Sequence, residues 1–544
     1  MFINIIKNKL KYNNLVSISI IFIFLISDQI SILNSERLPF FDNLPSFIIK
    51  YVILVVTWVA AFMLLYYVAM SGALFKWGVF SLITISTLVF DIFSAASYNT
   101  LLYSDYLGLR VAVSPEDITN VFNEYAGFFI HPVCRLILLF IAFLMLPSTI
   151  SSKNPVFKAL ILLVFCLAIF VIMVIKQETS IRKMPGFLSI YGFEVARLFE
   201  KNNYQYNYNN LLIEPKSKPI RQNVILVIDE SIRYDFINGE ESNEELNVKS
   251  NRFWNVYDYG SATSGNNCSG YSNIILRKGP KPENLGEEIQ KNPLIWAYAQ
   301  KAGYRTSLID AQRSGKGHDY FDSNELKMID NNVDTSNYKS DRDIAIELAH
   351  LLKNPGNFII VIKKGAHFPY VNKYPESFTP IFKSSYINQT QKRIEYARAI
   401  KYQTGGFFEE LLKQPLSPST VLVYTSDHGQ NLEDTKGTTH CTMNNDPYNG
   451  EGLVPMLLID NQINEQANSY SDINHNKSSH FNIFSTLLYF FGYEKNDYLK
   501  NYGLSLFDPI DRFGKFNYGS PFGYFGSKPK FVTTDEKIVH GFND

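Results

Sequence analysis

Residues 223–236 read NVILVIDESIRYDF, and this stretch decides the fold. Asn223 is followed by a continuous apolar run rich in β-branched side chains, which predicts a strand buried on both faces. Similar runs follow along the chain, namely YRTSLI, NFIIVI, TVLVYT and LVPMLLI. Segments with apolar residues at helical spacing lie between them, such as SDRDIAIELAHLL. We therefore expect an α/β domain with a mostly parallel sheet covered by helices on both faces.

Carboxylates and imidazoles follow three of these predicted strands. They are Asp229 and Glu230 after NVILVI, His367 after NFIIVI, and Asp427 and His428 after TVLVYT. A single strand-terminal Asp is more often a turn residue or a helix cap than a ligand. In open α/β sheets, however, ligands bind at the carboxyl ends of the strands, and this combination of oxygen and nitrogen donors suits a divalent metal.

Five apolar stretches occupy the first third of the chain, at residues 15–33, 51–70, 77–96, 128–146 and 159–175. Each has about the 20 residues that a helix needs to span a bilayer, so residues 1–176 are predicted to form a transmembrane domain with five helices. Asp28 and Gln29 interrupt the first stretch. A cleaved signal peptide is the alternative for it, but no small-residue cleavage site follows.

The lysines in the short loops predict the orientation of these spans. Six lysines lie on one side of the predicted spans. They precede the first span (Lys7, Lys9 and Lys11), separate the second from the third (Lys76), and separate the fourth from the fifth (Lys153 and Lys158). The positive-inside rule makes that side cytoplasmic. Everything after Lys176 then faces outward, which is the periplasm in a cell with two membranes. Within the spans, Asp91 and Arg135 either pair with each other or reach the interface.

The outward part divides into two predicted regions. Residues 177–221 are amphipathic and aromatic, which favours an interfacial bridging segment over an ordinary linker. Residues 222–544 form the predicted catalytic domain. Its Cys268 and Cys441 lie where a disulfide persists, although the sequence leaves their pairing open. A formal net charge of zero gives no indication of a nucleic-acid partner.

A cluster of hydroxyl-bearing residues lies in the stretch 258–273, DYGSATSGNNCSGYSN. By itself such a cluster is most simply a surface loop. A hydroxyl group is a weak nucleophile at neutral pH, but a divalent metal stabilises its alkoxide form. Beside a metal site, this cluster therefore becomes a candidate source of a nucleophile.

These motifs resemble those of the membrane-anchored phosphoethanolamine transferases of the alkaline phosphatase and sulfatase superfamily. NVILVIDESIRYDF resembles that family's strand followed by a glutamate and Ser/Thr-x-Arg, and VLVYTSDHGQNLED resembles its Ser-Asp-His-Gly segment. GAHFPY resembles its histidine-bearing loop, and SSHFNIFSTLLYFFGY its C-terminal helix. The resemblance implies an alkaline-phosphatase-like α/β/α catalytic domain in the periplasm, anchored in the bacterial inner membrane by several spans.

The resemblance also implies roles for individual residues. Glu230, Asp427 and His428 would bind one zinc ion together with a nucleophilic threonine, for which Thr263 fits best and Ser264 is the second candidate. A second zinc ion is left open. His367 and His440 would bind the substrate phosphate or that second ion, with exposed loop histidines as the alternative. Lys316 would meet an anionic head group or remain solvated.

The implied reaction transfers phosphoethanolamine from phosphatidylethanolamine to lipopolysaccharide or another envelope glycan, through a covalent threonine intermediate. Phosphoglycerol transfer with the same metal site is an alternative. A sulfatase-like hydrolase is less favoured, because Cys268 lies in CSGYS and lacks the Pro and Arg needed for conversion to formylglycine. A non-enzymatic membrane scaffold is the alternative from another class, and it has no use for clustered carboxylates that repel without a cation.

Overall fold

The computed structural model of this 544-residue chain contains two compact units. It describes residues 13–27, 44–96, 130–146, 153–176, 185–201, 207–238, 248, 250–312, 320–379, 390–416, 418–432, 434, 439–442, 447–519, 521–522 and 529–534. The first unit comprises Met1–Leu109 with Pro115–Tyr204, and the second comprises Arg110–Ser114 with Gln205–Asp544. The predicted bridging segment is thus divided between the units, near Tyr204.

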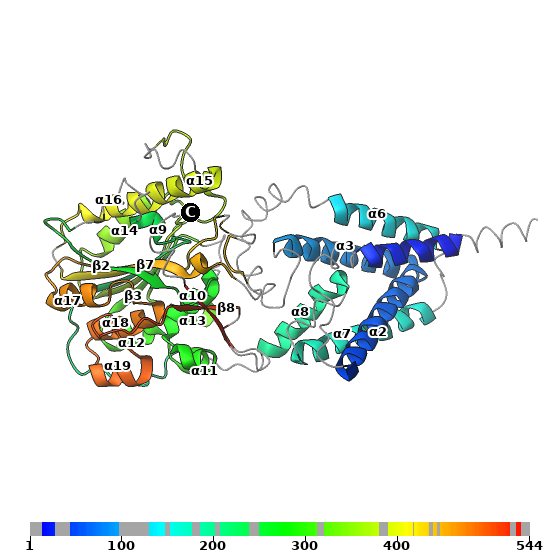
Figure 1. Cartoon of the computed structure of the whole chain (residues 1–544), viewed down its shortest axis with the longest axis horizontal. Coiled ribbons are helices and arrows are strands. Elements are labelled where there is room, and N and C mark those ends of the chain that lie inside the picture. The colour runs from blue at the N-terminus through cyan, green and yellow to red at the C-terminus, as the bar shows by residue number, and fades with distance from the viewer. Residues whose placement is uncertain are drawn as a thin grey trace, which may run out of the picture. The chain divides into compact units, whose positions relative to one another are not determined.

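Helices make up the described part of the first unit (Figure 1). They are Asn13–Ser27, α2 (Leu44–Ala69), α3 (Ala73–Ala96), α6 (Ile130–Met145), α7 (Lys153–Lys176) and α8 (Gly186–Lys201). A helix therefore overlaps each of the five predicted spans within the described residues. Among the described residues, one stretch, Ala73–Asp91, is long and apolar enough to cross a membrane by length and composition. The count of five spans remains a prediction.

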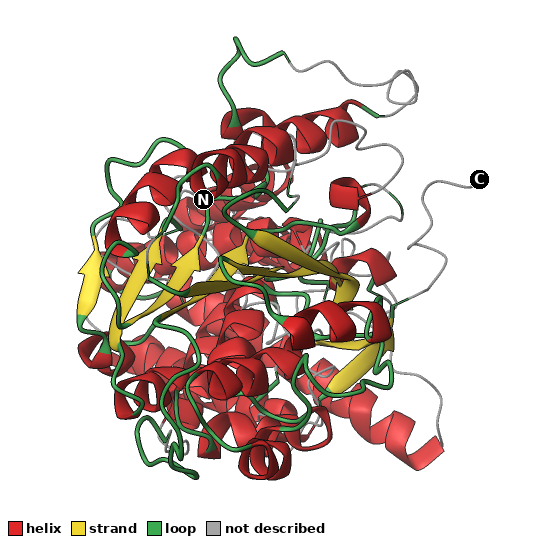
Figure 2. Cartoon of the chain, turned by 90° about the vertical axis from the view of Figure 1, so that its left-hand side faces the viewer, coloured by secondary structure: helices red, strands yellow, loops and turns green. Residues whose placement is uncertain are grey.

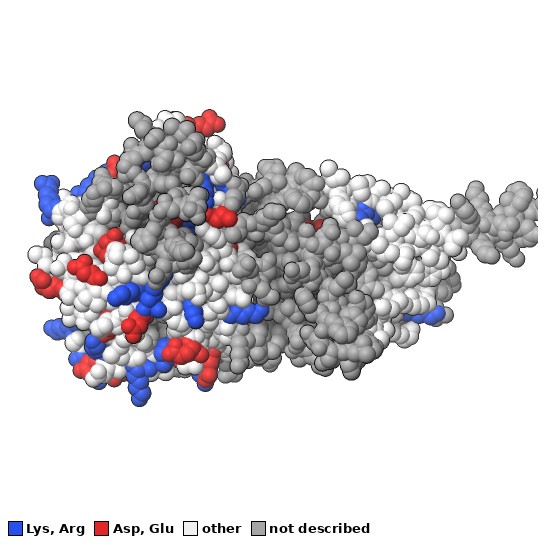
Figure 3. Space-filling model, in the orientation of Figure 1, with Lys and Arg blue, Asp and Glu red and all other residues white. Residues whose placement is uncertain are grey.

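The surfaces of the two units differ in charge. In the view of Figure 3, Lys, Arg, Asp and Glu are interspersed over the second unit, while the described surface of the first unit is nearly uncharged. Large apolar side chains of the first unit are exposed, for example Ile85 at 60% and Val164 at 65%. Within this unit Arg135 of α6 pairs with Asp91 of α3, with 3.0 Å between Nη1 and Oδ2. The pairing that the sequence left open is therefore formed.

A seven-stranded sheet forms the centre of the second unit, in the order β2-β7-β6-β1-β5-β3-β4. The strands are β1 (Asn223–Asp229), β2 (Asn255–Thr263), β3 (Arg305–Asp310), β4 (Asn331–Val333), β5 (Asn357–Ile362), β6 (Thr420–Ser426) and β7 (Leu453–Asp460). Pairing is parallel from β6 to β4, and β7 is antiparallel to both of its neighbours. The mostly parallel sheet expected from the sequence is confirmed, with β7 as the exception.

Helices cover both faces of this sheet (Figures 1 and 2). One layer contains α9 (Asp235–Asn238), α14 (Asp341–Leu351), α15 (Gln391–Ile400) and α16 (Gly406–Leu412). The other contains α10 (Ser269–Lys278), α11 (Leu285–Lys291), α12 (Ile295–Lys301), α13 (Ser323–Met328), α17 (Glu465–Ile473), α18 (Ile483–Phe490) and α19 (Lys495–Tyr502). A small second sheet pairs β8 (Lys515–Tyr518) with β9 (Lys530–Thr533).

The central strand β1 explains why this arrangement is stable. Alternate side chains of a strand point to opposite faces. Leu226 accordingly belongs to the core under α12, α18 and α19, and Val227 belongs to the core under α14, α15 and α16. Every residue of β1 is buried, which is why its sequence is a continuous apolar run rather than an alternating one.

Candidate metal centre and active site

The three predicted metal ligands come together at the carboxyl ends of two adjacent strands. Glu230 directly follows β1, and Asp427 and His428 directly follow β6. These strands are parallel and in register, with Asp229 opposite Ser426, so their last residues meet at one edge of the sheet. One ligand atom from each of the three residues lies within 4.8 Å of the others.

The electrostatics of this cluster favour a bound cation. Glu230, Asp427 and His428 are all buried. Burial, followed by the charge of Asp427, raises the pKa of Glu230 to about 7. Burial also raises the pKa of Asp427 and lowers the pKa of His428, which keeps the imidazole neutral. Two buried carboxylates beside a neutral imidazole are costly without a positive charge between them.

The individual donor atoms fit a zinc ion. Among the described residues, Oδ2 of Asp427 is buried without a hydrogen-bond partner, whereas its Oδ1 accepts the backbone N–H groups of Ser231 and His428 at 2.8 Å each. Nδ1 of His428 lies 2.7 Å from the carbonyl oxygen of Gly429, which assigns the proton to Nδ1. The lone pair of Nε2 then faces Asp427 Oδ2 at 3.5 Å. Two carboxylates and one imidazole are ordinary zinc ligands.

A serine hydroxyl lies beside these ligands. Ser269 is the first residue of α10, and its Oγ lies 3.0 Å from His428 Nε2 and 3.4 Å from Glu230 Oε1. With the Nδ1–H tautomer of His428, the Ser269 hydroxyl donates to Nε2. This hydroxyl therefore contacts two of the three candidate metal ligands and is a candidate nucleophile.

The two hydroxyls chosen from the sequence contact other partners in this structure. Thr263 is the last residue of β2, and its Oγ1 lies 3.4 Å from Oγ1 of Thr534. The Ser264 hydroxyl donates to the carbonyl of Asn266 at 2.8 Å. The physical reason is that the chain continues for five more residues after β2 before α10 begins. A hydroxyl at the first position of the helical pattern SGYSNIILRK was the signal that could have pointed to Ser269.

Two of the predicted histidines gather beside the metal ligands. The ring of His440 stacks on that of His428 with 4.4 Å between centroids, and the His367 ring lies 5.7 Å from that of His440. Burial, and then the neighbouring histidines, lower the pKa of His440 well below its usual value, so its imidazole is neutral. The prediction for Lys316 concerns a residue outside the described part of the chain.

Residues that sequence analysis missed support the ligand Glu230. Its Oε2 accepts the side-chain amide of Gln312 at 2.5 Å, and its Oε1 accepts the hydroxyl of Ser231 at 2.8 Å. Gln312 itself accepts the Tyr320 hydroxyl at 3.0 Å. Such outer partners orient a metal ligand. Gln312 follows β3 by two residues, so the rule of strand ends could have identified it.

A buried ion network underlies the same edge of the sheet. Lys363, at the end of β5, pairs with Asp229 and lies 3.4 Å from Asp341, and all three side chains are fully buried. Oδ1 of Asp229 accepts the backbone N–H of Glu230 at 2.9 Å. Asp341 accepts the N–H of Gly365, two residues before His367, at 3.2 Å. The network thus connects the metal ligand with the histidine-bearing loop.

Gly429, which follows the metal ligands, tolerates no side chain. A Cβ at this position would lie 2.1 Å from the carbonyl oxygen of Gly450 and 2.6 Å from that of Leu453. Because both obstacles are backbone atoms, we expect Gly429→Ala to destabilise the chain by about 2 kcal/mol and to weaken zinc binding through His428. Thermal unfolding and zinc content measure both effects. Gly78→Ala, where a Cβ meets nothing within 4 Å, is the control and should change neither.

The α/β/α layers and the candidate metal-binding residues at the strand ends are those of an alkaline-phosphatase-like catalytic domain. The family model "Sulfatase" matches residues 222–493, which is half of the chain. The chain therefore belongs to the sulfatase family, and the resemblance drawn from its motifs is confirmed at that level.

Comparison with solved structures gives the same fold. The integral membrane lipooligosaccharide phosphoethanolamine transferase A (EptA) from Neisseria meningitidis superposes with a TM-score of 0.55 at 16% identity, covering 88% of this chain and 97% of that one. The C-terminal periplasmic domain of EptC from Escherichia coli matches with a TM-score of 0.46 at 17% identity, over 61% of this chain and 97% of that one. No curated protein sequence matches this chain significantly.

Proposed function

We propose that this chain is a zinc-dependent phosphoethanolamine transferase, with Ser269 as its nucleophile. It would transfer phosphoethanolamine from phosphatidylethanolamine to lipopolysaccharide or another envelope glycan. The observation that carries the proposal is the Ser269 hydroxyl, 3.0 Å from His428 Nε2 beside two buried carboxylates. The likeness in fold to a phosphoethanolamine transferase over 88% of the chain supports the choice of reaction.

The first half-reaction makes one bond to phosphorus and breaks another. Zinc held by Glu230, Asp427 and His428 would favour the Ser269 alkoxide and offset negative charge on the phosphoryl oxygens. Ser269 Oγ loses its proton and attacks the phosphorus of the lipid. The bond between phosphorus and the diacylglycerol oxygen breaks, and that oxygen takes up a proton. The neutral His440 ring, stacked on His428, is in place to accept the Ser269 proton, and His367, whose ring lies against His440, is in place to deliver a proton to the diacylglycerol oxygen.

The second half-reaction restores the enzyme. A hydroxyl or phosphate oxygen of the acceptor attacks the phosphorus of phosphoethanolamine-Ser269, the bond to Ser269 Oγ breaks, and Ser269 regains a proton. The first N–H groups of α10 are in position to bind a phosphoryl oxygen during both steps, because they lie beside Ser269 at the positive end of the helix. We keep Lys316 as a proposed contact for an anionic head group.

The proposed location is the inner membrane, with the catalytic domain in the periplasm. Exposed apolar side chains on the helices of the first unit support contact with lipid. The disulfide between Cys268 and Cys441 in the second unit supports an oxidising compartment. Because donor and acceptor are both lipids, an anchored enzyme meets them within one bilayer.

Diacylglycerol release tests the proposed donor. The zinc-loaded, detergent-purified chain should release diacylglycerol from phosphatidylethanolamine at least about tenfold faster than from phosphatidylglycerol. Without an acceptor, release should stop near one equivalent per chain, and lipopolysaccharide should restore turnover. A preference for phosphatidylglycerol would contradict the donor and favour phosphoglycerol transfer. No release from either lipid with zinc bound would contradict the transferase proposal.

A further inference from the structure

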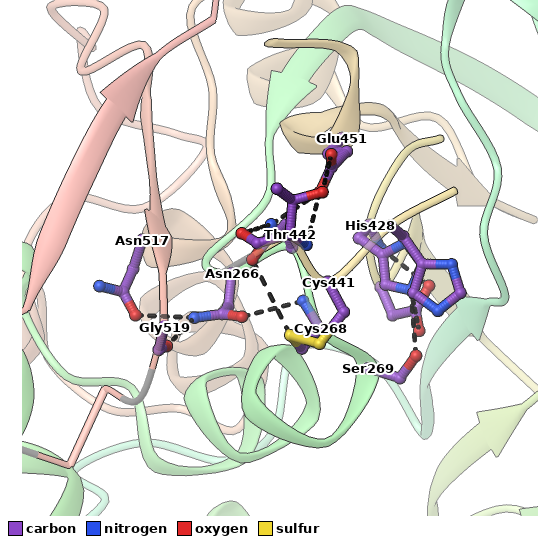
Figure 4. The surroundings of a disulfide bond; sticks show 12 residues. Asn266, Cys268, Ser269, His428, Cys441, Thr442, Glu451, Asn517 and Gly519 are labelled. Atoms are coloured by element: carbon purple, nitrogen blue, oxygen red, sulfur yellow. Dashed lines mark hydrogen bonds and ion pairs between the residues drawn. A yellow bond between two sulfur atoms is a disulfide. The ribbon is translucent and has the colours of Figure 1, made fainter. Parts of the chain in front are cut away.

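The disulfide bond joins the two segments that carry Ser269 and His440. Cys268 is the residue before Ser269 and the N-cap of α10, and Cys441 is the residue after His440. Their Cα atoms lie 4.5 Å apart, although 173 positions separate them in sequence. Figure 4 shows the bond next to Ser269 and His428. The crosslink therefore fixes the proposed nucleophile relative to a histidine of the site.

A buried carboxylate joins the same two segments a second time. Glu451 is fully buried, and its Oε2 accepts the side-chain amide of Asn267 at 2.7 Å and the backbone N–H of Thr442 at 3.1 Å. Its Oε1 accepts the Thr442 hydroxyl at 2.7 Å. The N–H of Cys441 donates to the carbonyl of Asn267 at 2.8 Å. Glu451 thus bonds to Asn267, the residue before Cys268, and to Thr442, the residue after Cys441 (Figure 4).

The His440 side chain makes one hydrogen bond and two ring contacts in the described part of the chain. Its Nδ1 bonds to the hydroxyl of its neighbour Thr439 at 3.0 Å, and its ring contacts those of His428 and His367. The backbone at Cys441 and Thr442 is held by the disulfide and Glu451. These contacts therefore determine where the His440 ring lies relative to Ser269.

We propose that the Cys268–Cys441 disulfide and Glu451 are positioning groups that hold His440 in place for phosphoryl transfer, so that the oxidised form is the active one. This inference rests on the proposed function. Dithiothreitol supplies two electrons and two protons: the Sγ–Sγ bond breaks, two thiols form, and the reagent closes to its cyclic disulfide. Reduction would release the His440 segment while leaving Glu230, Asp427 and His428 in place.

Paired serine substitutions test the disulfide. Serine is a favourable N-cap, so C268S/C441S keeps the start of α10 while removing the crosslink. We expect kcat for diacylglycerol release to fall about 100-fold, with KM within about threefold and zinc content unchanged, because small displacements of a reacting group cost about this much. The C134S/C166S variant removes the two free cysteines of the first unit and should keep full activity. Dithiothreitol should inactivate this control and have no effect on C268S/C441S.

A second substitution determines whether the disulfide acts through His440. In a His440→Ala background, C268S/C441S should lower kcat by less than about threefold, because coupled residues are not additive. An equal loss in both backgrounds, or full activity of C268S/C441S, would overturn the proposal.

Glu451→Gln should lower kcat about tenfold, since both carboxylate oxygens accept N–H donors and an amide N–H would oppose one of them. Full activity of Glu451→Gln would overturn its assigned role.

Hydrogen exchange separates failure of this inference from failure of the proposed function. If wild-type protein releases no diacylglycerol, the function fails but the positioning contacts are still measurable. Reduction should then speed amide exchange in residues 439–442 of the zinc-loaded chain, because the N–H groups of Cys441 and Thr442 lose their fixed acceptors. Unchanged exchange after complete reduction would overturn the inference.

Discussion

Ser269→Ala is expected to lower kcat for diacylglycerol release by about 10⁴-fold or more, while zinc content stays at the wild-type level. The hydroxyl is the oxygen that lies 3.0 Å from His428 Nε2, and loss of a nucleophile in other enzymes costs about this factor. The three remaining side chains still supply a zinc site. Initial rates at saturating phosphatidylethanolamine, with metal analysis of the same sample, measure both quantities.

Thr263→Ala is the matched control for that experiment. Its hydroxyl lies against Thr534 and not against the metal ligands, so activity should remain within about threefold. Loss of one modest hydrogen bond should cost about 1 kcal/mol of stability. An inactive Thr263→Ala variant beside an active Ser269→Ala variant would return the nucleophile to the position first chosen from the sequence.

Removal of zinc is expected to reverse the pH dependence of stability. Without metal, the folded-state pKa of Glu230 is about 7, above its ordinary value of 4.5, so the folded state binds this proton more tightly than the unfolded chain. The stability from this group is complete below pH 4.5 and is lost as the pH rises through 7. Metal-free protein should therefore lose about 3 kcal/mol between these limits.

Zinc-loaded protein should behave in the opposite way, because metal binding requires deprotonated carboxylates and weakens in acid. Melting temperatures at pH 5.5 and pH 8, with and without a chelator, test this. Burial also raises the pKa of Glu451 to about 7, and this group titrates in both forms. The difference in melting temperature between zinc-loaded and metal-free protein therefore reports on the metal ligands and not on Glu451. A zinc effect that is equal at both pH values would contradict the assigned ligand set.

The sequence predicted those parts of the site that depend on strand ends. Glu230, Asp427 and His428 each follow a continuous apolar run, and neighbouring parallel strands bring such positions together without further information. Strand β2 was missed, because NVYDYGSAT contains no apolar run and is interrupted by a bulge between Asp258 and Ser261. The end of β2 and the start of α10 decide which hydroxyl reaches the metal ligands.

Long-range contacts account for what the sequence could not provide. Glu451 lies in a short loop, NGEG, where a glutamate is normally solvated, and only the approach of Asn267 and Thr442 makes it a buried acceptor. The pairing of Cys268 with Cys441 likewise depends on the packing of segments 173 positions apart. Five apolar stretches were recognisable by length, and helices of 24 to 26 residues lie over three of them, at α2, α3 and α7.

Peptide mass spectrometry after incubation with phosphatidylethanolamine, without an acceptor, tests the central claim most directly. The account predicts one phosphoethanolamine adduct on the zinc-loaded chain, located at Ser269 and absent from Ser269→Ala. An adduct on Thr263 or Ser264, or no adduct on a fully zinc-loaded chain that releases diacylglycerol, would contradict a covalent mechanism through Ser269.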